Sequence, residues 1–565
     1  MVGASRKTQY TDKPVCQGTT YRYRVQSCGV GGCSNFSDEV VATTPAPQVN
    51  LRVTGAHMNQ VVQTFGGDVP LVASRPGLLR VFVEAEEANG LGPDVEIRLY
   101  HDSAHVHTET IPAPRCGIPT SNHEALSTHV WAWPIPRSLV TPDLGLTVTI
   151  DPDGKILAGS PEDNDHHSLS QSESLDVREV PPLDLRIVPI HHDSTGLTGG
   201  HFSGLIDDAF AMLPIAELNE AVNRVYTTTL PPLKSDNSNR AWTELLSEIN
   251  ALRVAEGTGE HYYGLVRTTY PAGVAGMGYV GSPTAIGWDR EPSASGVFAH
   301  ELGHNFGRRH APCPSHISSL DSSFPYPEGV IGQVGLDDGT LLDPETKRDI
   351  MSYCRPRWIS DYTYEGILDF RGTAPGSPQA ASSPPRQASL VLWGVIGPDW
   401  ATLRPAFEAE TRPSLPESAG PYSIEGTDAH GRVLFSHAFE GVETGKEDGT
   451  RSFAFAIPLT TFSSDDLVDI RLRKGASTME RRTRSAIPDM ALLELRSRRE
   501  VDGRTLIEWD AEQAPLLVVR HPISNRILSL AQGGQVRLPS WDAQGELDLT
   551  LSDGVRSQSN RAALR

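Results

Sequence analysis

Three histidines at fixed spacing constrain this chain most: His300, His304 and His310. On an α-helix, His300 and His304 lie one turn apart on one face, with about 5 to 6 Å between their Cβ atoms, so both imidazoles can meet one metal ion. Gly307 has the backbone freedom to end that helix in a left-handed turn, after which the chain can bring His310 to a third position. The segment therefore predicts a helix, a tight turn and a bound metal.

Glu301 directly follows the first histidine and is offset from the line of ligands. It can hydrogen-bond a water held by the metal without binding the metal itself. Three histidines leave one position of a tetrahedral zinc ion open, and zinc lowers the pKa of a water there to about 7. We therefore expect Zn²⁺ as the cofactor and Glu301 as the general base.

Residues 300–310 read HELGHNFGRRH, and the segment 349–353, DIMSY, follows further along the chain. Together they resemble the metzincin zinc proteases, which combine HExxHxxGxxH with a later methionine turn. The resemblance implies a metalloendopeptidase that hydrolyses peptide bonds of extracellular proteins, glycoproteins included, with a zinc-activated water. It also implies that Met351 lies beneath the ligands and that Tyr353 is a catalytic residue donating to the transition-state oxyanion. Simple packing is the alternative for Tyr353.

Two other patterns in the sequence are weaker evidence for a functional site. Residues 276–281, GMGYVG, match GxGxxG, but Ser282-Pro283-Thr284 follows where a nucleotide site needs a helix. Ala275 to Val280 resembles instead the metzincin edge strand that pairs with extended substrate. The pairs His166-His167 and His191-His192 lack ligand spacing, and we expect solvated loops there.

The chain is long, and its patterns change along its length. At 565 residues it exceeds what a single core usually supports. Both ends show short alternating strands punctuated by Pro and Gly, whereas strands and helices interleave in the middle. We expect a multi-domain protein: an α/β (α+β) catalytic domain flanked by antiparallel β-sandwich domains. The expected boundaries are a partial fibronectin type III module at 1–48, an immunoglobulin-like β-sandwich at 49–183, the metzincin-like catalytic domain at 184–371, a Pro/Ser linker at 372–387, and a C-terminal β-rich region of one or two sandwiches at 388–565.

Within the predicted catalytic domain, apolar spacing predicts individual elements. A buried strand is expected at 184–190, and helical periodicity follows around 204–226. A second helix is expected over 241–256, where apolar residues recur every three to four positions. Further strands are expected at 261–268 and 274–280.

Six cysteines indicate an oxidising compartment. Cys28 and Cys33 flank a Gly-rich turn, and Cys313 and Cys354 bracket the predicted metal site. We expect each to form a local disulfide, with buried free thiols as the alternative.

Cys116 lies in the segment PRCGIP, which resembles the cysteine switch of matrixin propeptides. A thiolate there would occupy the open zinc position until removed. Pairing with Cys16, or burial as a free thiol, is the alternative.

The charge balance bears on partners and location. Lys plus Arg number 49 against 70 Asp plus Glu, a net charge of -21, with no basic run. Nucleic acids and anionic membranes favour basic patches, so neither is expected as a partner. No transmembrane segment is expected either.

We predict a secreted or extracellular protein. The first residues lack the order of a signal peptide, which predicts a fragment or a misassigned start. Oligomeric state is left open.

Two alternatives to a peptidase stay open. In the first, the chain is an adhesion or glycan-binding protein whose β-domains provide the function and whose zinc site is structural or vestigial. In the second, zinc serves the hydrolysis of a non-peptide amide. The complete ligand set with an adjacent general base favours an enzyme.

Overall fold

The computed structural model describes residues 4–13, 15–45, 48–122, 124, 129–154, 156, 175–200, 202–314, 320–372, 384–416, 419–446, 448–484, 494–539 and 546–563. Most of the predicted linker at 372–387 lies outside these ranges, as do His166 and His167. The chain divides into two compact units. The first holds Met1–Val180, Val330–Arg348 and Pro356–Glu365, and the second holds Pro181–Gly329, Asp349–Arg355 and Gly366–Arg565.

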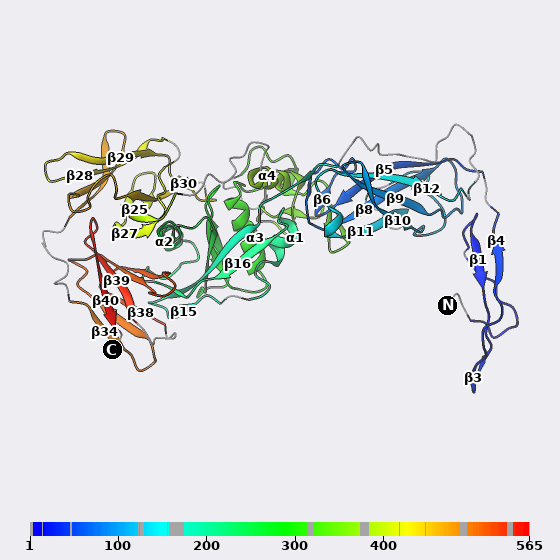
Figure 1. Cartoon of the computed structure of the whole chain (residues 1–565), viewed down its shortest axis with the longest axis horizontal. Helices are drawn as coiled ribbons and strands as arrows, with labels where there is room; N and C mark the ends of the chain where they lie inside the picture. Colours follow the sequence, from blue (N-terminus) through cyan, green and yellow to red (C-terminus); the bar gives the residue numbers. More distant parts are fainter. Residues whose placement is uncertain are drawn as a thin grey trace. The chain divides into compact units, whose positions relative to one another are not determined.

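Strands dominate the described residues, which form forty strands and four α-helices. Figure 1 shows the helices confined to the green, middle part of the sequence. The predicted α/β fold class is therefore wrong, and the chain is mostly β. One cause lies in 204–226, where the expected helical stretch forms only α1 (Asp207–Met212) and then strands β16 (Leu218–Val222) and β17 (Tyr226–Thr228). Pro214 cannot continue a helix, and both strands gain parallel pairing with β14 (Leu183–His192).

The second unit is built on a seven-stranded sheet in the order β15-β14-β18-β20-β19, with β16 and β17 also paired to β14. The additional bounds are β15 (Leu197–Thr198), β18 (His261–Val266), β19 (Gly276–Gly278) and β20 (Thr284–Trp288). Strands β14, β18 and β20 are parallel and almost wholly buried, whereas β19 runs antiparallel at the edge. The expected loop at His191 and His192 is wrong, because both residues lie buried at the end of β14.

Helix α2 (Ala241–Glu256) has the bounds predicted for it. Nearly all of its residues are buried, so it is enclosed on every side and is not a surface helix with one apolar face. Its polar groups find partners on neighbouring strands. Glu248 accepts hydrogen bonds from Tyr226 Oη (2.5 Å) and Thr228 Oγ1 (3.3 Å), and the Val254 carbonyl accepts one from Thr411 Oγ1 (2.6 Å).

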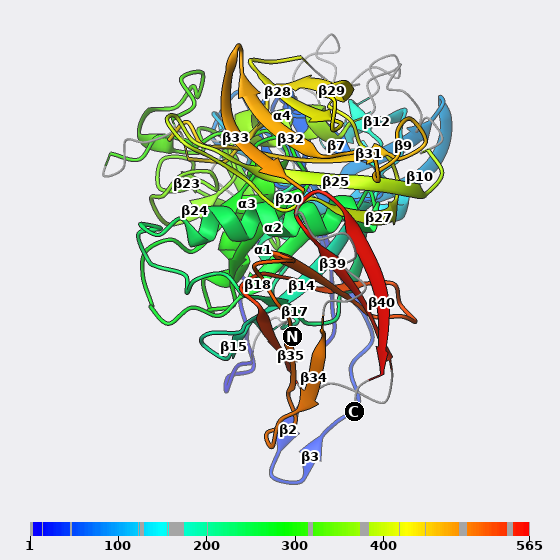
Figure 2. The same cartoon turned by 90° about the vertical axis from the view of Figure 1, so that its left-hand side faces the viewer.

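The remainder of the second unit is antiparallel β structure after helix α4 (Asp361–Arg371). In Figure 2, β25 lies above α2 and β39 lies below it. The strands group into sheets as follows: β25 (Gln387–Ile396), β26 (Ala401–Leu403), β27 (Phe407–Thr411), β30 (Val442–Glu443) and β31 (Arg451–Pro458); β28 (Tyr422–Thr427), β29 (Val433–Phe439), β32 (Asp469–Lys474) and β33 (Ser477–Thr483); β34 (Arg496–Arg499), β35 (Thr505–Glu508) and β38 (Gln535–Leu538); β36 (Leu516–Arg520), β37 (Ile527–Ala531), β39 (Glu546–Ser552) and β40 (Ser557–Ala563).

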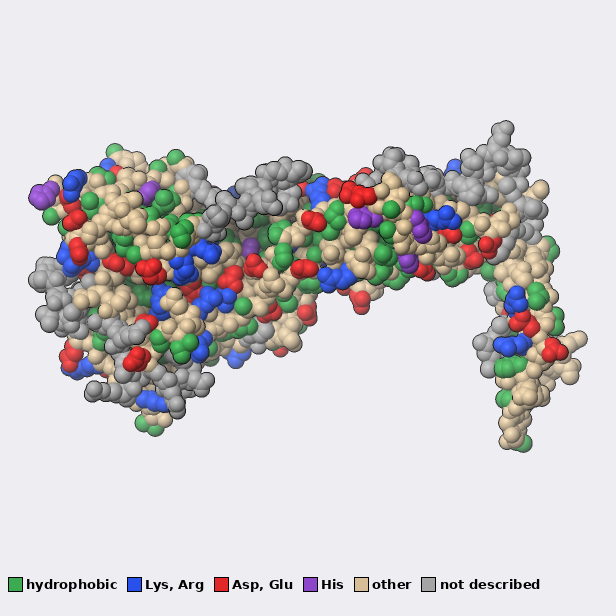
Figure 3. Space-filling model, in the orientation of Figure 1, with side chains coloured by type: hydrophobic (Ala, Val, Ile, Leu, Met, Phe, Trp, Pro, Cys, Tyr) green, Lys and Arg blue, Asp and Glu red, His purple; other side chains and the backbone are tan. Residues whose placement is uncertain are grey.

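The surface gives limited information on partners. Among the described residues, no helix is both long and apolar enough to cross a membrane. On the face in Figure 3, Lys and Arg side chains are interspersed with Asp and Glu. That the chain does not bind nucleic acid stays a prediction.

The first unit is mainly antiparallel β structure, with one short parallel pair (β7 and β13), around an apolar core that includes Val81, Leu99 and Val148. Strand β9 alternates buried and more exposed residues, as expected for a strand with one face on a core. The strands of this unit are β1 (Thr20–Tyr23) with β4 (Val40–Thr43); β2 (Cys28–Gly29) with β3 (Gly32–Cys33); β5 (Leu51–Asn59), β8 (Gly77–Ala85) and β11 (Trp131–Ile135); β9 (Val95–His101), β10 (Ala104–Ile111) and β12 (Leu144–Ile150); β7 (Leu71–Val72) with β13 (Val177–Arg178); β6 (Val62–Gln63), β21 (Val334–Asp337) and β22 (Thr340–Leu342); and β24 (Arg357–Trp358), while β23 (Arg348–Asp349) lies at the boundary of the units.

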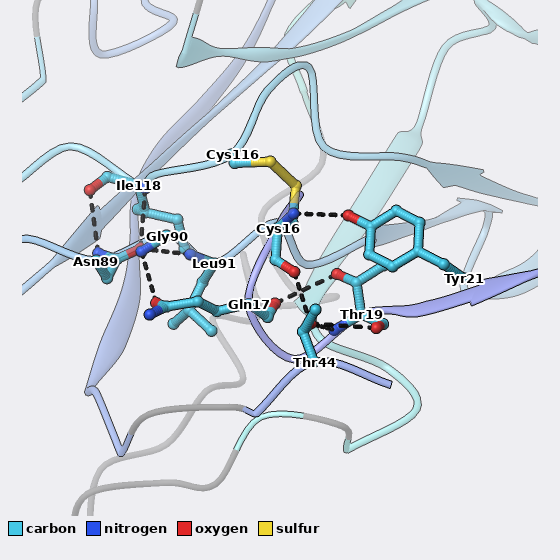
Figure 4. Close-up of a disulfide and its surroundings, with 10 residues drawn as sticks. All are labelled: Cys16, Gln17, Thr19, Tyr21, Thr44, Asn89, Gly90, Leu91, Cys116 and Ile118. Atoms are coloured by element: carbon cyan, nitrogen blue, oxygen red, sulfur yellow. Dashed lines mark hydrogen bonds between the residues drawn. A yellow bond between two sulfur atoms is a disulfide. The ribbon is translucent and has the colours of Figure 1, made fainter. Parts of the chain in front are cut away.

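Two disulfides lie in the first unit. Cys28 pairs with Cys33, as predicted, and Cys116 pairs with Cys16. Figure 4 shows the second bridge beside Tyr21, whose hydroxyl accepts a hydrogen bond from the Cys16 amide (2.6 Å). Of the possibilities weighed for Cys116, pairing with Cys16 is therefore confirmed and the cysteine switch is ruled out, because a sulfur bonded to another sulfur is not a thiolate that can bind zinc.

The buried carboxyl group in α2 gives a stability prediction. Burial raises the pKa of Glu248 to about 7. Between its ordinary pKa and about 7, the folded chain holds a proton that the unfolded chain has lost, so this group lowers stability as pH rises through that window. Glu248→Gln, which does not titrate, should therefore gain stability relative to the wild type from pH 4.5 to 7, by up to roughly 3 kcal/mol.

Denaturant unfolding at several pH values checks this. Glu512→Gln, at an exposed position, serves as the control, and its free energy of unfolding should equal that of the wild type at every pH. A Glu248→Gln curve parallel to that of the wild type over the whole range would contradict the assignment of a raised pKa.

Candidate metal centre

Helix α3 (Ala294–Asn305) carries His300, Glu301 and His304. The helix ends as predicted at Gly307, which has a left-handed backbone (φ 81°). Its amide donates to the His304 carbonyl (2.8 Å). The Arg308 amide donates back to the Gly303 carbonyl (3.0 Å), which completes a Schellman motif. This turn reverses the chain directly after the second histidine.

The reversal brings His310 back to the helix. His310 Nε2 lies 3.1 Å from His304 Nε2, and its ring centroid is 5.2 Å from that of His300. One nitrogen from each of the three residues lies within 4.8 Å of the other two, and all three residues are buried. The structure thus brings together the three predicted ligands.

Two of the imidazoles are oriented by backbone carbonyls. His300 Nδ1 is 2.9 Å from the Ile350 carbonyl, and His304 Nδ1 is 2.7 Å from the Arg308 carbonyl. A carbonyl only accepts, so each Nδ1 carries the hydrogen and each Nε2 keeps a lone pair. The lone pairs of these two residues are therefore available to a cation, and second contacts of this kind are typical of metal-binding histidines.

Glu301 lies between the histidines and the sheet edge. Its side chain lines a small cavity together with the three histidines, Gly276 and Gly278. A Cβ on Gly276 would lie 2.6 Å from Glu301 Oε1, and one on Gly278 would lie 3.2 Å from Oε2. Glycines at these two positions of the GxGxxG pattern therefore make room for the carboxylate.

The segment after Asp349 forms the other side of the centre. Met351 is fully buried, and its amide donates to Asp349 Oδ1 (2.8 Å). Tyr353 is 37% exposed, and its hydroxyl lies 3.0 Å from His310 Nε2. The phenol therefore reaches the ligand atoms, as required of the predicted catalytic tyrosine. The predicted disulfide between Cys313 and Cys354 is confirmed and joins this segment to the chain after His310.

Burial shifts the pKa values of several groups at the site. Burial lowers the pKa of His304 to about 4, so the imidazole is neutral near pH 7. Burial also lowers the pKa of Lys446, while the Glu301 carboxylate acts to raise it. Burial, reinforced by the charge of Glu301, raises the pKa of Tyr263 well above its ordinary value.

Gly445 and Lys446 also line the cavity, whose volume is about 20 Å³. One water molecule needs roughly 10 to 15 Å³ of cavity volume, so this cavity has room for one or two waters. Sequence reasoning found no functional residues in the C-terminal region. No signal could have found these two, since nothing in the sequence around them has ligand spacing or strand alternation.

Comparisons with known proteins give no family. No protein-family model matches the sequence, and no curated protein matches it. Similar solved structures include a glycosyl hydrolase family 2 member from Bacteroides cellulosilyticus DSM 14838 (10% identity, covering 90% of this chain and 79% of that chain, TM-score 0.15). They also include a β-glucuronidase from glycoside hydrolase family 2 (10%, 91% and 63%, TM-score 0.16) and a β-glycosidase from Bacteroides vulgatus (10%, 94% and 80%, TM-score 0.15). TM-scores of this size define no common fold, so no glycosidase activity follows from them.

The family and activity predicted from the histidine motif are corrected accordingly. No family model matches the chain, so neither membership of the metzincins nor their peptidase activity is supported. The chain is therefore not assigned to the metzincins or to any other family, and the predicted metalloendopeptidase activity is withdrawn. The physical reason is that a short motif specifies a site, whereas a family is defined by the domain around that site.

Gly303 generates a prediction about the helix that holds the ligands. Replacing a mid-helix glycine with alanine ordinarily stabilises a protein by up to about 1 kcal/mol. A Cβ on Gly303 would instead overlap the sulfur of buried Met351. Gly303→Ala should therefore destabilise the chain, by roughly 1 to 3 kcal/mol, because the methionine or the helix must move.

Gly296→Ala, in the same helix, is the matched control, because its Cβ would meet only the end of the Asp208 side chain, at 3.3 Å. Thermal unfolding of both variants decides the question. Equal stabilisation by the two substitutions would show that Met351 does not pack against Gly303.

Proposed function

We propose that His300, His304 and His310 bind a zinc ion and that the chain is a zinc-dependent hydrolase. The observation that carries this proposal is the pair of Nδ1 contacts to backbone carbonyls, which leaves Nε2 lone pairs facing His310. Without a cation, a hydrogen on His310 Nε2 can satisfy the lone pair of His304, 3.1 Å away, but it leaves the outward-bonded His300 with repulsion among the remaining lone pairs of the cluster. A shared cation removes that repulsion.

The donor set fits zinc in particular. Neutral imidazole suits zinc and other late transition metals, whereas calcium and magnesium require oxygen ligands. The ligand cluster offers three nitrogens and leaves room for one further ligand, as in catalytic zinc sites. Structural zinc sites are instead closed by four protein ligands.

The chain's own residues supply the rest of the chemistry. When bound, zinc supplies Lewis acidity and lowers the pKa of a water molecule. Glu301 lines the cavity beside the ligands and is largely buried, so its carboxylate would serve as the general base that accepts a proton at the site and passes it to a leaving group. The Tyr353 hydroxyl, at the ligand atoms, is placed to donate a hydrogen bond to negative charge that develops on a substrate oxygen.

In a second candidate function, the chain binds zinc but catalyses no hydrolysis. Gly445 and Lys446 line the cavity, which leaves only about 20 Å³ beside the ligands. This observation favours an adhesion or glycan-binding protein in which zinc is structural. Removal of a structural zinc would lower the melting temperature strongly, and loading with zinc would produce no hydrolysis.

The disulfides support a location for either function. The described residues contain three disulfides and no free cysteine. Disulfides persist in oxidising compartments and are rare in the cytosol. We therefore propose that the protein is secreted or extracellular.

Metal binding is the first test. The wild type should bind one zinc ion per chain, and His304→Ala should weaken binding by at least about 100-fold, because a ligand and its oriented lone pair are lost. The exposed His430→Ala is the control and should leave zinc binding unchanged. Equal zinc affinity in His304→Ala and the wild type would rule out this site.

Hydrolysis of 4-nitrophenyl acetate by the zinc-loaded chain is the second test. Glu301→Gln should keep zinc and lose about 100-fold or more in rate, since general-base catalysis commonly contributes that much. The exposed Glu291→Gln should retain the wild-type rate. An unchanged rate in Glu301→Gln, or no zinc-dependent rate in any variant, would leave only the structural role.

A further inference from the structure

A segment far along the chain lies on the edge of the central sheet. The Gly445 amide donates to the Gly278 carbonyl (3.0 Å), and the Val280 amide donates to the Glu443 carbonyl (2.9 Å). Between these bonds, Tyr279 and Thr444 form an antiparallel bridge. Residues 442–446, called the strap below, therefore pair as a short strand with the continuation of edge strand β19.

The strap also covers the metal centre. A Cβ on Gly445 would overlap the His304 ring at Nε2, the atom proposed to bind zinc. Lys446 lines the same cavity as Glu301, and the Glu301 charge acts on it. Only about 20 Å³ remains between the strap and the histidines. With the strap in place, the space directly beside the ligand atoms has room for one or two waters.

Ion pairs hold the strap from both sides. Glu443 lies 2.7 Å from Arg309 Nη2 and 2.6 Å from Arg451 Nη2. Arg309 belongs to the turn between His304 and His310, whereas Arg451 lies on β31, with which Glu443 also pairs as part of β30. One carboxylate thus links the C-terminal sheet to the loop that carries the third ligand.

We propose that the strap is a built-in closing segment that must leave the edge of β19 before a substrate reaches the metal centre. This inference rests on the proposed zinc site. The backbone groups that the strap uses, the Gly278 carbonyl and the Val280 amide, are the ones an extended ligand would need in order to pair with this edge. The strap and such a ligand are therefore mutually exclusive.

Glu443→Ala tests the proposal on the full chain. It removes both ion pairs and leaves the backbone bonds, so the strap should open more often, by about threefold to tenfold, given the small energies of partly exposed pairs. Glu440→Ala is the matched control, because Glu440 pairs with Arg451 (2.9 Å) and lies before the strap. Two rates are measured: hydrogen exchange of peptides covering 276–282 and 442–446, and loss of zinc to dipicolinate.

The proposal expects Glu443→Ala to raise both rates together and Glu440→Ala to raise neither. Faster exchange with an unchanged rate of zinc loss would overturn it, because the strap would then open without exposing the metal. Unchanged exchange at both peptides would also overturn it. If the wild type binds no zinc, the proposed function fails, while the exchange rates still report whether Glu443 holds the strap.

Gly445→Ala is the second variant, in case Glu443→Ala does not fold. Its Cβ cannot occupy the position against His304, so the strap must move away from the ring. The proposal expects unprotected amides in 442–446 and faster loss of zinc than in the wild type. Wild-type protection and wild-type zinc loss in this variant would overturn the proposal.

Discussion

The metal centre depends on two hydrogen bonds from imidazole to backbone. The Ile350 carbonyl fixes His300, and the Arg308 carbonyl fixes His304, so each ring turns its Nε2 inward. The second carbonyl is placed by the Schellman turn at Gly307, and the first lies in the segment that the Cys313–Cys354 bridge ties to the loop after His310. The helix end, the disulfide and the two carbonyls therefore together orient the Nε2 atoms of His300 and His304.

The C-terminal strands enclose the part of the chain that holds this centre. Strands β25, β27, β31 and β37 pack against α2, and through the strap the C-terminal region reaches the edge of β19 beside the ligands. A carboxylate, Glu443, joins them to the turn between two ligands. The C-terminal region thus packs against the central domain and, in the proposal made above, also closes access to the candidate metal centre.

The sequence predicted the local features of the site and, through the cysteines and the segment 349–353, one of its long-range contacts, but it missed the pairing with the C-terminal region. Spacing of three and four residues revealed α2 and α3, and Gly307 marked the turn, because these depend on neighbours along the chain. The pairing of Gly278 with Gly445 depends on backbone groups that every residue carries, so no residue type signals it. The mostly β class was missed because strand pairing overrode helical periodicity around 204–226. The family was wrong because the motif specifies a site and not a domain.

The account's central claim is that three imidazole nitrogens bind one zinc ion. Anomalous diffraction measured on either side of the zinc absorption edge, from crystals of the full chain grown with zinc, tests it directly. The account predicts a single strong peak within about 2.0 to 2.1 Å of Nε2 of His300, His304 and His310. No peak there, or a peak held by only one of the three rings, would contradict it.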